Sequence, residues 1–278
     1  MRPANEAPPA SRIAVGQMNP DPGNVEANLM QIESIVRAAA DAGAKLVVLP
    51  ETATTGYFIT DRLAELAEAD DGPTSIRVGR IAGTCGVHVA VGMPIAADGN
   101  FYDAQLLFGP DGRRLATYHK AHLFSAEREY YAPGDAPLVV DTELGCIGMT
   151  VCYDLIFPDY VRRLVDLGAH VVINSTNWIS DAWQRDRWGW TGPVVQALAG
   201  TRALENGIWL AMADCYGPEA GFDSLGYSCV AAPSGRIIAS VGQGQGFAMA
   251  DIVHNGEDLD KWRGIATYRQ DRRPELYG

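Results

Sequence analysis

The chain has 278 residues, 47% hydrophobic and 20% charged, which is enough apolar material for one large α/β domain. Its formal net charge of −12 argues against nucleic acid or an anionic membrane as a partner, because both would be repelled. No apolar run approaches the roughly 20 residues of a membrane-spanning helix, so we expect no membrane insertion.

The opening segment and the cysteines predict a cytoplasmic protein. Residues 1–11 are rich in Pro and Ala and lack the apolar core of a secretory signal. We therefore expect a disordered tail over residues 1–11 and a single domain over residues 12–278. The cysteines form no CxxC pair and no metal-ligand cluster, which is typical of a reducing compartment. They are Cys85, Cys146, Cys152, Cys215 and Cys229, and we expect all except Cys152 to be core residues.

The first half of the chain begins with a strand–helix–strand unit. A strand is predicted over residues 12–19, and a helix over 24–45 has Leu29 and Ile32 at helical spacing and Gly43 as its stop. A continuous apolar run then predicts a buried strand that ends at Glu51. A helix over 75–86, a strand over 87–95 and a hairpin over 101–120 around Asp111–Gly112 follow, before a loop over 121–137.

The second half repeats this alternation. A hairpin over 138–152 ends at Cys152, and a helix with Pro158 near its start leads to a strand over 171–178. A helix over 192–207, a strand over 208–217, a hairpin over 226–240 and a strand over 246–253 precede a charged C-terminal segment. Alternating strands and helices mixed with hairpins predict an α/β fold with mixed sheets. The similarity of the two halves does not by itself establish a duplication.

Three polar residues stand where predicted strands end: Glu51, Lys120 and Cys152. Strand ends present side chains to the crevice at the edge of a sheet, so the three could share one site. Each alone has an ordinary structural explanation, as a cap, a surface lysine and a core cysteine. Their joint occurrence favours a site.

The segments around these residues, "LVVLPETATTGY", "YHKAHLF" and "GMTVCYDLIFPDYVRRL", resemble the signature segments of the nitrilase, or carbon–nitrogen hydrolase, superfamily. They occur in the family's order, and the resemblance extends over about residues 12–253. It implies an α-β-β-α sandwich with two mixed β-sheets. It also implies a catalytic triad of Glu51, Lys120 and Cys152 that requires no cofactor and no metal.

The chemistry of these groups agrees with the implied roles. Only a thiolate attacks efficiently, and Glu51 can remove the thiol proton while the Lys120 ammonium favours the developing negative charge. The Tyr153 backbone N–H, with the helix beginning near Pro158, would help to hold the oxyanion. The resemblance implies a second glutamate after the lysine, for which Glu127 is the best match and Glu129 the competitor.

Other residues near the strand ends could bind substrate or pack. We expect Tyr57, Tyr153, Asn177 and Trp178 to line the acyl pocket, with a packed aromatic as the alternative for Trp178. His119 and His122 flank Lys120, and we expect them to orient the loop or pack. Trp183, Trp188 and Trp190 could cover the pocket or form a subunit contact.

The resemblance leaves several functions open. The leading hypothesis is hydrolysis of a small carboxamide to acid and ammonia, and nitrile hydrolysis and N-carbamoyl hydrolysis are the alternatives. A binding or scaffold protein without activity is the non-enzymatic alternative. We expect a homodimer or larger homo-oligomer, for which Val161, Leu164 and Val165 form an apolar stripe that could equally serve a monomer's core.

Overall fold

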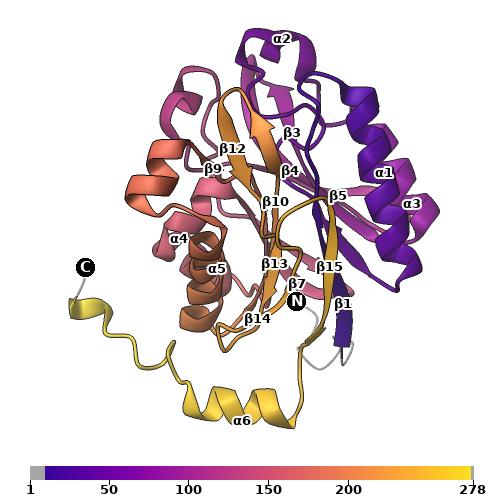
Figure 1. Cartoon of the computed structure of the whole chain (residues 1–278). Helices are drawn as coiled ribbons and strands as arrows, with labels where there is room; N and C mark the ends of the chain where they lie inside the picture. The colour runs from indigo at the N-terminus through magenta and orange to yellow at the C-terminus, as the bar shows by residue number, and fades with distance from the viewer. Residues whose placement is uncertain (1–9, 277–278) are drawn as a thin grey trace.

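The structure, a computed structural model, describes residues 10–276. Two six-stranded mixed sheets lie between two pairs of helices, and Figure 1 shows α1 and α3 on one outer side and α4 and α5 on the other. The predicted α-β-β-α sandwich is therefore confirmed. Among the described residues, no helix is both long and apolar enough to cross a membrane.

The first sheet has the strand order β15-β1-β2-β3-β4-β5. Its central pairs β1·β2 and β2·β3 are parallel, whereas β1·β15, β3·β4 and β4·β5 are antiparallel. The strands are β15 (Gly246–Val253), β1 (Ala10–Gln17), β2 (Leu46–Val48), β3 (His88–Ala97), β4 (Asn100–Phe108) and β5 (Arg114–His119). The tail expected over residues 1–11 overlaps β1 at Ala10 and Ser11, and the rest of it lies outside the described residues.

The second sheet has the order β14-β13-β10-β8-β7-β6, and its central pairs β7·β8 and β8·β10 are again parallel. Its strands are β14 (Ile237–Ser240), β13 (Cys229–Ala231), β10 (Trp209–Asp214), β8 (Val171–Thr176), β7 (Gly145–Val151) and β6 (Val139–Thr142). The succession β7-α4-β8-α5-β10-β13-β14 thus matches β1-α1-β2-α3-β3-β4-β5, so the similar halves of the sequence fold into similar halves of the structure.

The outer helices are amphipathic segments that cover the sheets. They are α1 (Val25–Asp41), α3 (Pro73–Cys85), α4 (Pro158–Asp166) and α5 (Gly192–Asn206). Proline occupies the first turn of α3, α4 and α5, where its missing N–H leaves no helical hydrogen bond unmade. Val161, Leu164 and Val165 are buried in the core of the chain itself, so the apolar stripe of α4 serves that core.

Alternation along the strands divides the core into two clusters. On β1, Ile13 and Val15 belong to the cluster that includes the second sheet, whereas Ala14 packs in the cluster that includes α1 and α3. A polar link also joins the sheets near their carboxyl ends, because Ser175 Oγ on β8 donates to the Leu49 carbonyl oxygen at 2.7 Å. This link holds the segment before Glu51 against the strand before Asn177.

Several elements were not predicted. A small third sheet has the order β11-β12-β9, formed by β11 (Tyr216–Glu219), β12 (Phe222–Leu225) and β9 (Ile179–Ser180). The strand predicted over 208–217 therefore ends earlier, with β10. A short helix α2 (Leu63–Leu66) lies in the first half, and the charged C-terminal segment contains α6 (Glu257–Ile265), which Figure 1 shows below the main body.

Cysteine burial also differs from expectation. All five cysteines are free, and Cys215 and Cys229 are buried as predicted. Cys85 and Cys146 are only partly buried, because they lie near the ends of α3 and β7 rather than inside the core.

Candidate active site

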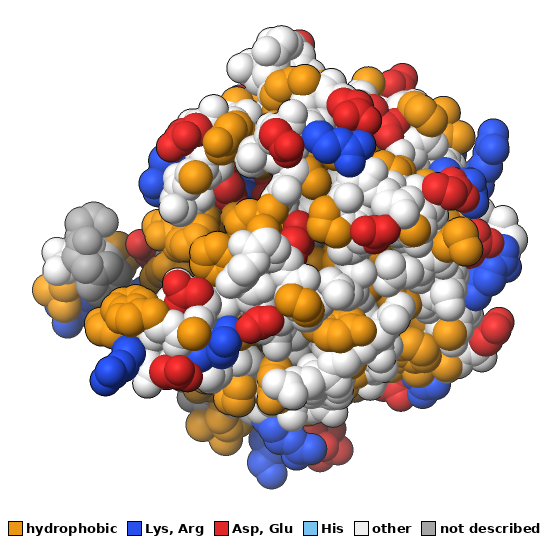
Figure 2. Space-filling view, turned by 45° about the horizontal axis from the view of Figure 1, so that its top comes forward, with side chains coloured by type: hydrophobic (Ala, Val, Ile, Leu, Met, Phe, Trp, Pro, Cys, Tyr) orange, Lys and Arg blue, Asp and Glu red, His pale blue; other side chains and the backbone are white. Residues whose placement is uncertain are grey.

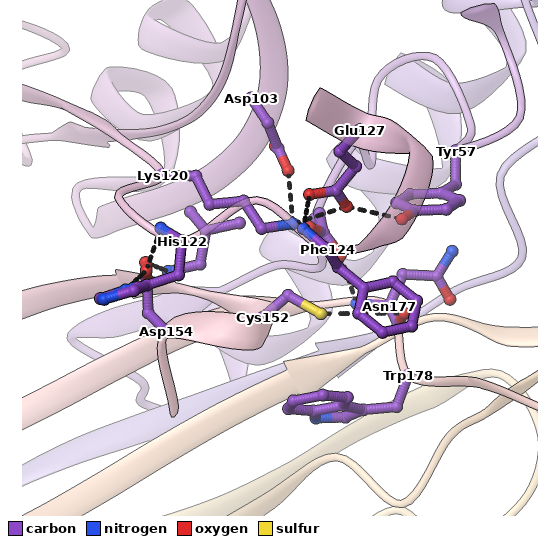
Figure 3. A network of polar contacts seen from close by, with 12 residues as sticks. Tyr57, Asp103, Lys120, His122, Phe124, Glu127, Cys152, Asp154, Asn177 and Trp178 are labelled. Atoms are coloured by element: carbon purple, nitrogen blue, oxygen red, sulfur yellow. Dashed lines mark hydrogen bonds and ion pairs between the residues drawn. The ribbon is translucent and has the colours of Figure 1, made fainter. Parts of the chain in front are cut away.

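Lys120 is the centre of a buried charged cluster shown in Figure 3. It follows the last residue of β5 and is 0% exposed. Its Nζ donates to Glu51 Oε1 at 2.5 Å, to Glu127 Oε1 at 2.8 Å and to Asp103 Oδ2 at 3.0 Å. The three acids offer oxygens within 4.8 Å of one another, the spacing of a cation site, and the Lys120 ammonium contacts all three. The ammonium is therefore the cation that this cluster holds.

The pKa values in the cluster follow from burial and from its excess of carboxylates. Burial raises the pKa of Glu51 well above its usual range, Lys120 opposes this shift, and Asp103 and Glu127 add to it. Burial alone would lower the pKa of Lys120, but the three carboxylates together raise it well above its usual value. Lys120 therefore remains an ammonium at neutral pH, and Glu51 binds a proton more readily than an exposed glutamate does.

Glu51 is held from both sheets. It is the third residue after β2, and its Oε2 accepts the backbone N–H of Asn177, which follows β8, at 2.8 Å. Gly92 on β3 permits this position, because a Cβ at residue 92 would lie 2.5 Å from the Glu51 Cα. Thr52, the next residue, has a φ of +45°, a strained backbone conformation of the kind that recurs at functional sites.

Cys152 stands at a sharp bend between β7 and a 3₁₀ turn over Cys152–Ile156. Its φ of +43° is uncommon for a residue other than glycine, and its side chain is 5% exposed. The thiol lies 3.9 Å from the carbonyl oxygen of Asn177, to which it can donate. Burial raises the pKa of the Cys152 thiol well above its usual value, and the Glu51 carboxylate adds to the rise. A base is therefore needed to generate the thiolate.

Asp154 holds this bend and is a functional candidate that the sequence analysis missed. It is fully buried, and its Oδ2 accepts the Val151 N–H at 3.0 Å and the Tyr118 hydroxyl at 2.7 Å. Its Oδ1 accepts the His122 N–H at 2.9 Å and lies 2.8 Å from His122 Nδ1. Asp154 thereby ties the bend at Cys152 to the segment that carries Lys120 (Figure 3).

The two histidines beside Lys120 orient and pack, as predicted. The His122 ring stacks on Phe157, with ring centroids 3.9 Å apart. The His119 ring stacks on Tyr102 at 4.0 Å.

Of the two candidates for the second glutamate, Glu127 is in the cluster and Glu129 is exposed. Both lie in a 3₁₀ turn over Ser125–Glu129, which turns Glu127 toward Lys120. The Glu127 Oε1 accepts the Tyr57 hydroxyl at 2.5 Å, and its Oε2 accepts the Phe124 N–H at 2.7 Å. Every carboxylate oxygen of Glu127 is therefore already hydrogen-bonded within the protein.

Glu219 on β11 is a second acid that the sequence analysis missed. Its Oε1 accepts the backbone N–H groups of Tyr57 and Phe58 at 2.9 and 2.7 Å. These bonds fix the loop that presents the Tyr57 hydroxyl to Glu127.

A cavity of about 410 Å³ opens beside Cys152. The four predicted pocket residues all line it: Tyr57, Tyr153, Asn177 and Trp178. Trp183, Trp188 and Trp190 line it as well, and Trp183 and Trp188 are 62% and 76% exposed at its mouth. Figure 2 shows hydrophobic side chains gathered on the left of the face in view. The structure thus brings all eight predicted site residues to one place.

Asp103 is the third missed residue, although it contacts Lys120 directly. It lies on β4 and is buried, and its backbone oxygen also accepts the Lys120 N–H at 2.9 Å. The available signal was a lone acidic residue within the largely apolar stretch "FYDAQLLF".

Comparisons with known proteins agree with this geometry. The family model "Carbon-nitrogen hydrolase" matches residues 12–261. A protein of Pseudomonas protegens called "Hydrolase in pqqF 5'region" is 34% identical over 272 residues, covering 96% of this chain and 90% of its own. A protein of Pyrococcus abyssi called nitrilase is 29% identical over 275 residues, covering 96% of this chain and 98% of its own.

Among solved structures, an amidase from Nesterenkonia sp. is similar, with a TM-score of 0.82, 29% identity and coverage of 96% of this chain and 95% of that chain. One structure of a variant of that amidase contains butyramide. In another variant, the acetamide moiety of fluoroacetamide is covalently added to the active-site cysteine.

Proposed function

Because the chain belongs to the carbon–nitrogen hydrolase family of the nitrilase superfamily, we propose that it hydrolyses a small carboxamide to a carboxylic acid and ammonia through a thioester on Cys152. The observation that carries this proposal is the contact of Lys120 with both Glu51 and Glu127 beside Cys152 at a cavity. A protein of this family is an enzyme, which disfavours the scaffold alternative.

In the acylation step, Cys152 Sγ attacks the amide carbonyl carbon while Glu51 accepts the thiol proton. Protonation of Glu51 releases the Lys120 N–H that it held, and this N–H together with the backbone N–H of Tyr153 then holds the oxyanion. Loss of one oxyanion donor typically lowers the rate by about 10²–10³-fold. Protonated Glu51 then gives its proton to the departing nitrogen, the C–N bond breaks, and ammonia leaves a thioester on Cys152.

In the deacylation step, Glu51 removes a proton from a water molecule that attacks the thioester carbonyl. The C–S bond breaks, the carboxylic acid leaves, and the proton returns to the Cys152 sulfur. Glu127 positions Lys120 throughout, and Asn177 fixes Glu51 by its backbone N–H. Tyr57, Tyr153, Asn177 and Trp178 surround the acyl group.

The amide is proposed ahead of the nitrile because of the similar amidase and its covalent cysteine adduct. The similar protein named nitrilase keeps nitrile hydrolysis as the second candidate, since the same thiolate can attack a nitrile carbon and reach the same thioester. N-carbamoyl hydrolysis uses the same groups and is the third candidate.

We also propose a cytoplasmic homo-oligomer. The five free cysteines fit a reducing compartment. Leu167, Val194 and Leu204 are exposed apolar side chains on or next to α4 and α5, where a second copy could bury them. Light scattering after size-exclusion chromatography would give a mass of at least twice 29.9 kDa, and a monomer at micromolar concentration would contradict this.

The test of function is ammonia release from a panel of amides, nitriles and N-carbamoyl amino acids, with Cys152→Ala as the control. Release from amides that disappears in Cys152→Ala supports the proposal. Release from nitriles alone would make nitrile hydrolysis the function. No release from any member of the panel would overturn the proposal.

A further inference from the structure

The cavity beside Cys152 has an uncharged, aromatic lining. None of its described lining residues is Asp, Glu, Lys, Arg or His. On its inner side, Trp178 is 6% exposed and meets Trp190 edge-to-face, with ring centroids 5.7 Å apart. At its mouth, Trp183 and Trp188 stack at 6.3 Å. Flat apolar groups gain most from such walls, because aromatic pairs add to the energy of burial.

A second cavity of about 320 Å³ shares the walls Tyr57, Phe124, Ile179 and Gln184 with the first. Its one charged lining residue among those described is Glu127, whose oxygens already accept bonds from Lys120, Tyr57 and the Phe124 N–H. Neither cavity therefore provides a cation to pair with a carboxylate on the substrate.

The surroundings strengthen this bias against anions. Lys120 is in contact with three carboxylates, so the cluster has no positive charge to spare. Arg185, next to Gln184 in sequence, donates to Asp223 Oδ2 at 2.6 Å and to the Ser180 carbonyl oxygen at 3.0 Å. A substrate carboxylate would lose its hydration without gaining a cation to pair with, which is strongly unfavourable.

A neutral polar group, by contrast, would find partners. Both side-chain atoms of Asn177, Oδ1 and Nδ2, are buried without a hydrogen-bond partner, and so is Trp178 Nε1. Asn177 is 3% exposed and lines the cavity beside Cys152. Unpaired buried groups of this kind in a cavity point to a ligand that completes their hydrogen bonds.

We propose, as a refinement that rests on the proposed amidase function, that the substrate is a carboxamide with an aromatic acyl group that carries no carboxylate. The ring lies among Tyr153, Ile156, Trp178 and Trp190, and Asn177 bonds a neutral polar atom of the substrate. Ligand pockets for drug-sized molecules span roughly 300–1,000 Å³. The cavity of about 410 Å³ therefore holds far more than the acyl group of a short aliphatic amide.

The test compares kcat/KM, by ammonia release, for phenylacetamide, its 4-carboxylate and acetamide. Phenylacetamide is expected to exceed the 4-carboxylate by about 10²-fold or more, because the cavities give that charge no cation to pair with. It is also expected to exceed acetamide. A 4-carboxylate or acetamide that matches phenylacetamide would overturn this inference while leaving the amidase function intact. No release from any amide would overturn the function itself.

A charged side chain introduced into the cavity wall provides a second test of the inference. Gln184→Arg puts a cation where both cavities meet and should raise the ratio of kcat/KM for the 4-carboxylate over that for phenylacetamide by at least about 10-fold. Gln243→Arg makes the same change at an exposed position that lines neither cavity, and should leave the ratio unchanged. If Gln184→Arg fails to fold, Ile156→Arg places a cation in the wall of the cavity beside Cys152 instead. An unchanged ratio in a folded cavity variant contradicts the inference.

Discussion

Lys120 Nζ lies 2.5 Å from Glu51 Oε1, and neither side chain is exposed. Glu51 follows β2 of the first sheet and Lys120 follows β5 of the same sheet, so the pair links its centre to its edge. The same Glu51 bonds the Asn177 N–H of the second sheet at 2.8 Å. These two contacts therefore fix the Glu51 carboxylate relative to the Lys120 ammonium and to the loop beside Cys152.

The pH dependence of activity should report the raised pKa of Glu51. Burial raises that pKa, so the inactive protonated form should persist to higher pH than the value of about 4.3 for an ordinary glutamate. Activity should rise as pH increases through the raised pKa. Lys120, with its own pKa raised, should stay charged to at least about pH 10. A profile of kcat/KM between about pH 4 and pH 10 checks both the rise with pH from Glu51 and the constant charge of Lys120. Constant activity down to pH 4 would exclude Glu51 as the base.

Asp103→Asn should move the acidic limb of the kcat/KM profile, where activity rises with pH, to lower pH. Asp103 raises the pKa of Glu51, so removal of its charge lets Glu51 ionise at a lower pH. The variant should also lose about 10-fold in kcat/KM, because Lys120 loses a charge-assisted bond. Asp98→Asn, at an exposed turn in the preceding hairpin, is the control. An acidic limb that stays in place or moves upward would show that Asp103 does not act on Glu51.

Glu127→Gln and Glu129→Gln make the same change two residues apart. Glu127→Gln should lower kcat/KM by about 10–100-fold, the equivalent of one charge-assisted hydrogen bond to Lys120. Glu129 is exposed, and its variant should keep wild-type activity. Steady-state kinetics on both variants shows which glutamate supports Lys120. An equal loss of kcat/KM in the two variants would contradict the role proposed for Glu127.

Gly92→Ala should disturb both stability and activity. The new Cβ would lie 2.5 Å from the Glu51 Cα and 2.5 Å from the Pro50 carbonyl oxygen, which is backbone that cannot easily shift. Overpacking of this kind typically destabilises by about 1–3 kcal/mol. Gly264→Ala is the matched control, since no atom lies within 4 Å of its added Cβ. The thermal unfolding temperature and kcat should both fall in Gly92→Ala and not in Gly264→Ala. A Gly92→Ala protein with unchanged stability and activity would contradict the close approach of residue 92 to the backbone of Pro50 and Glu51.

The sequence predicted an α/β fold with mixed sheets because buried strands give continuous apolar runs between helical segments. The resemblance of three short motifs to the nitrilase superfamily implied the sandwich and the proposed triad of Glu51, Lys120 and Cys152. Asn177 and Trp178 directly follow β8, as expected of side chains that a strand end presents to a crevice, whereas Tyr57 lies in the loop after β2.

The missed residues act through contacts between segments distant in sequence. Asp103 meets Lys120 across the antiparallel pair β4·β5, and Glu219 meets the Tyr57 loop from a hairpin 162 residues later. The small sheet β11-β12-β9 combines strands of only two to four residues, too short for a periodic pattern. Helix α6 has a largely charged sequence without a buried face, so no apolar periodicity could reveal it.

The central claim is that Cys152 carries the acyl group as a thioester. The most direct measurement is mass spectrometry of peptides from enzyme quenched with acid during turnover of the amide that it hydrolyses fastest. The peptide containing Cys152 should gain the mass of the acyl group, lose it on treatment with hydroxylamine, and show no gain in the Cys152→Ala protein, which should release no ammonia. An acyl group on another residue, or ammonia release by Cys152→Ala at the wild-type rate, would contradict the account.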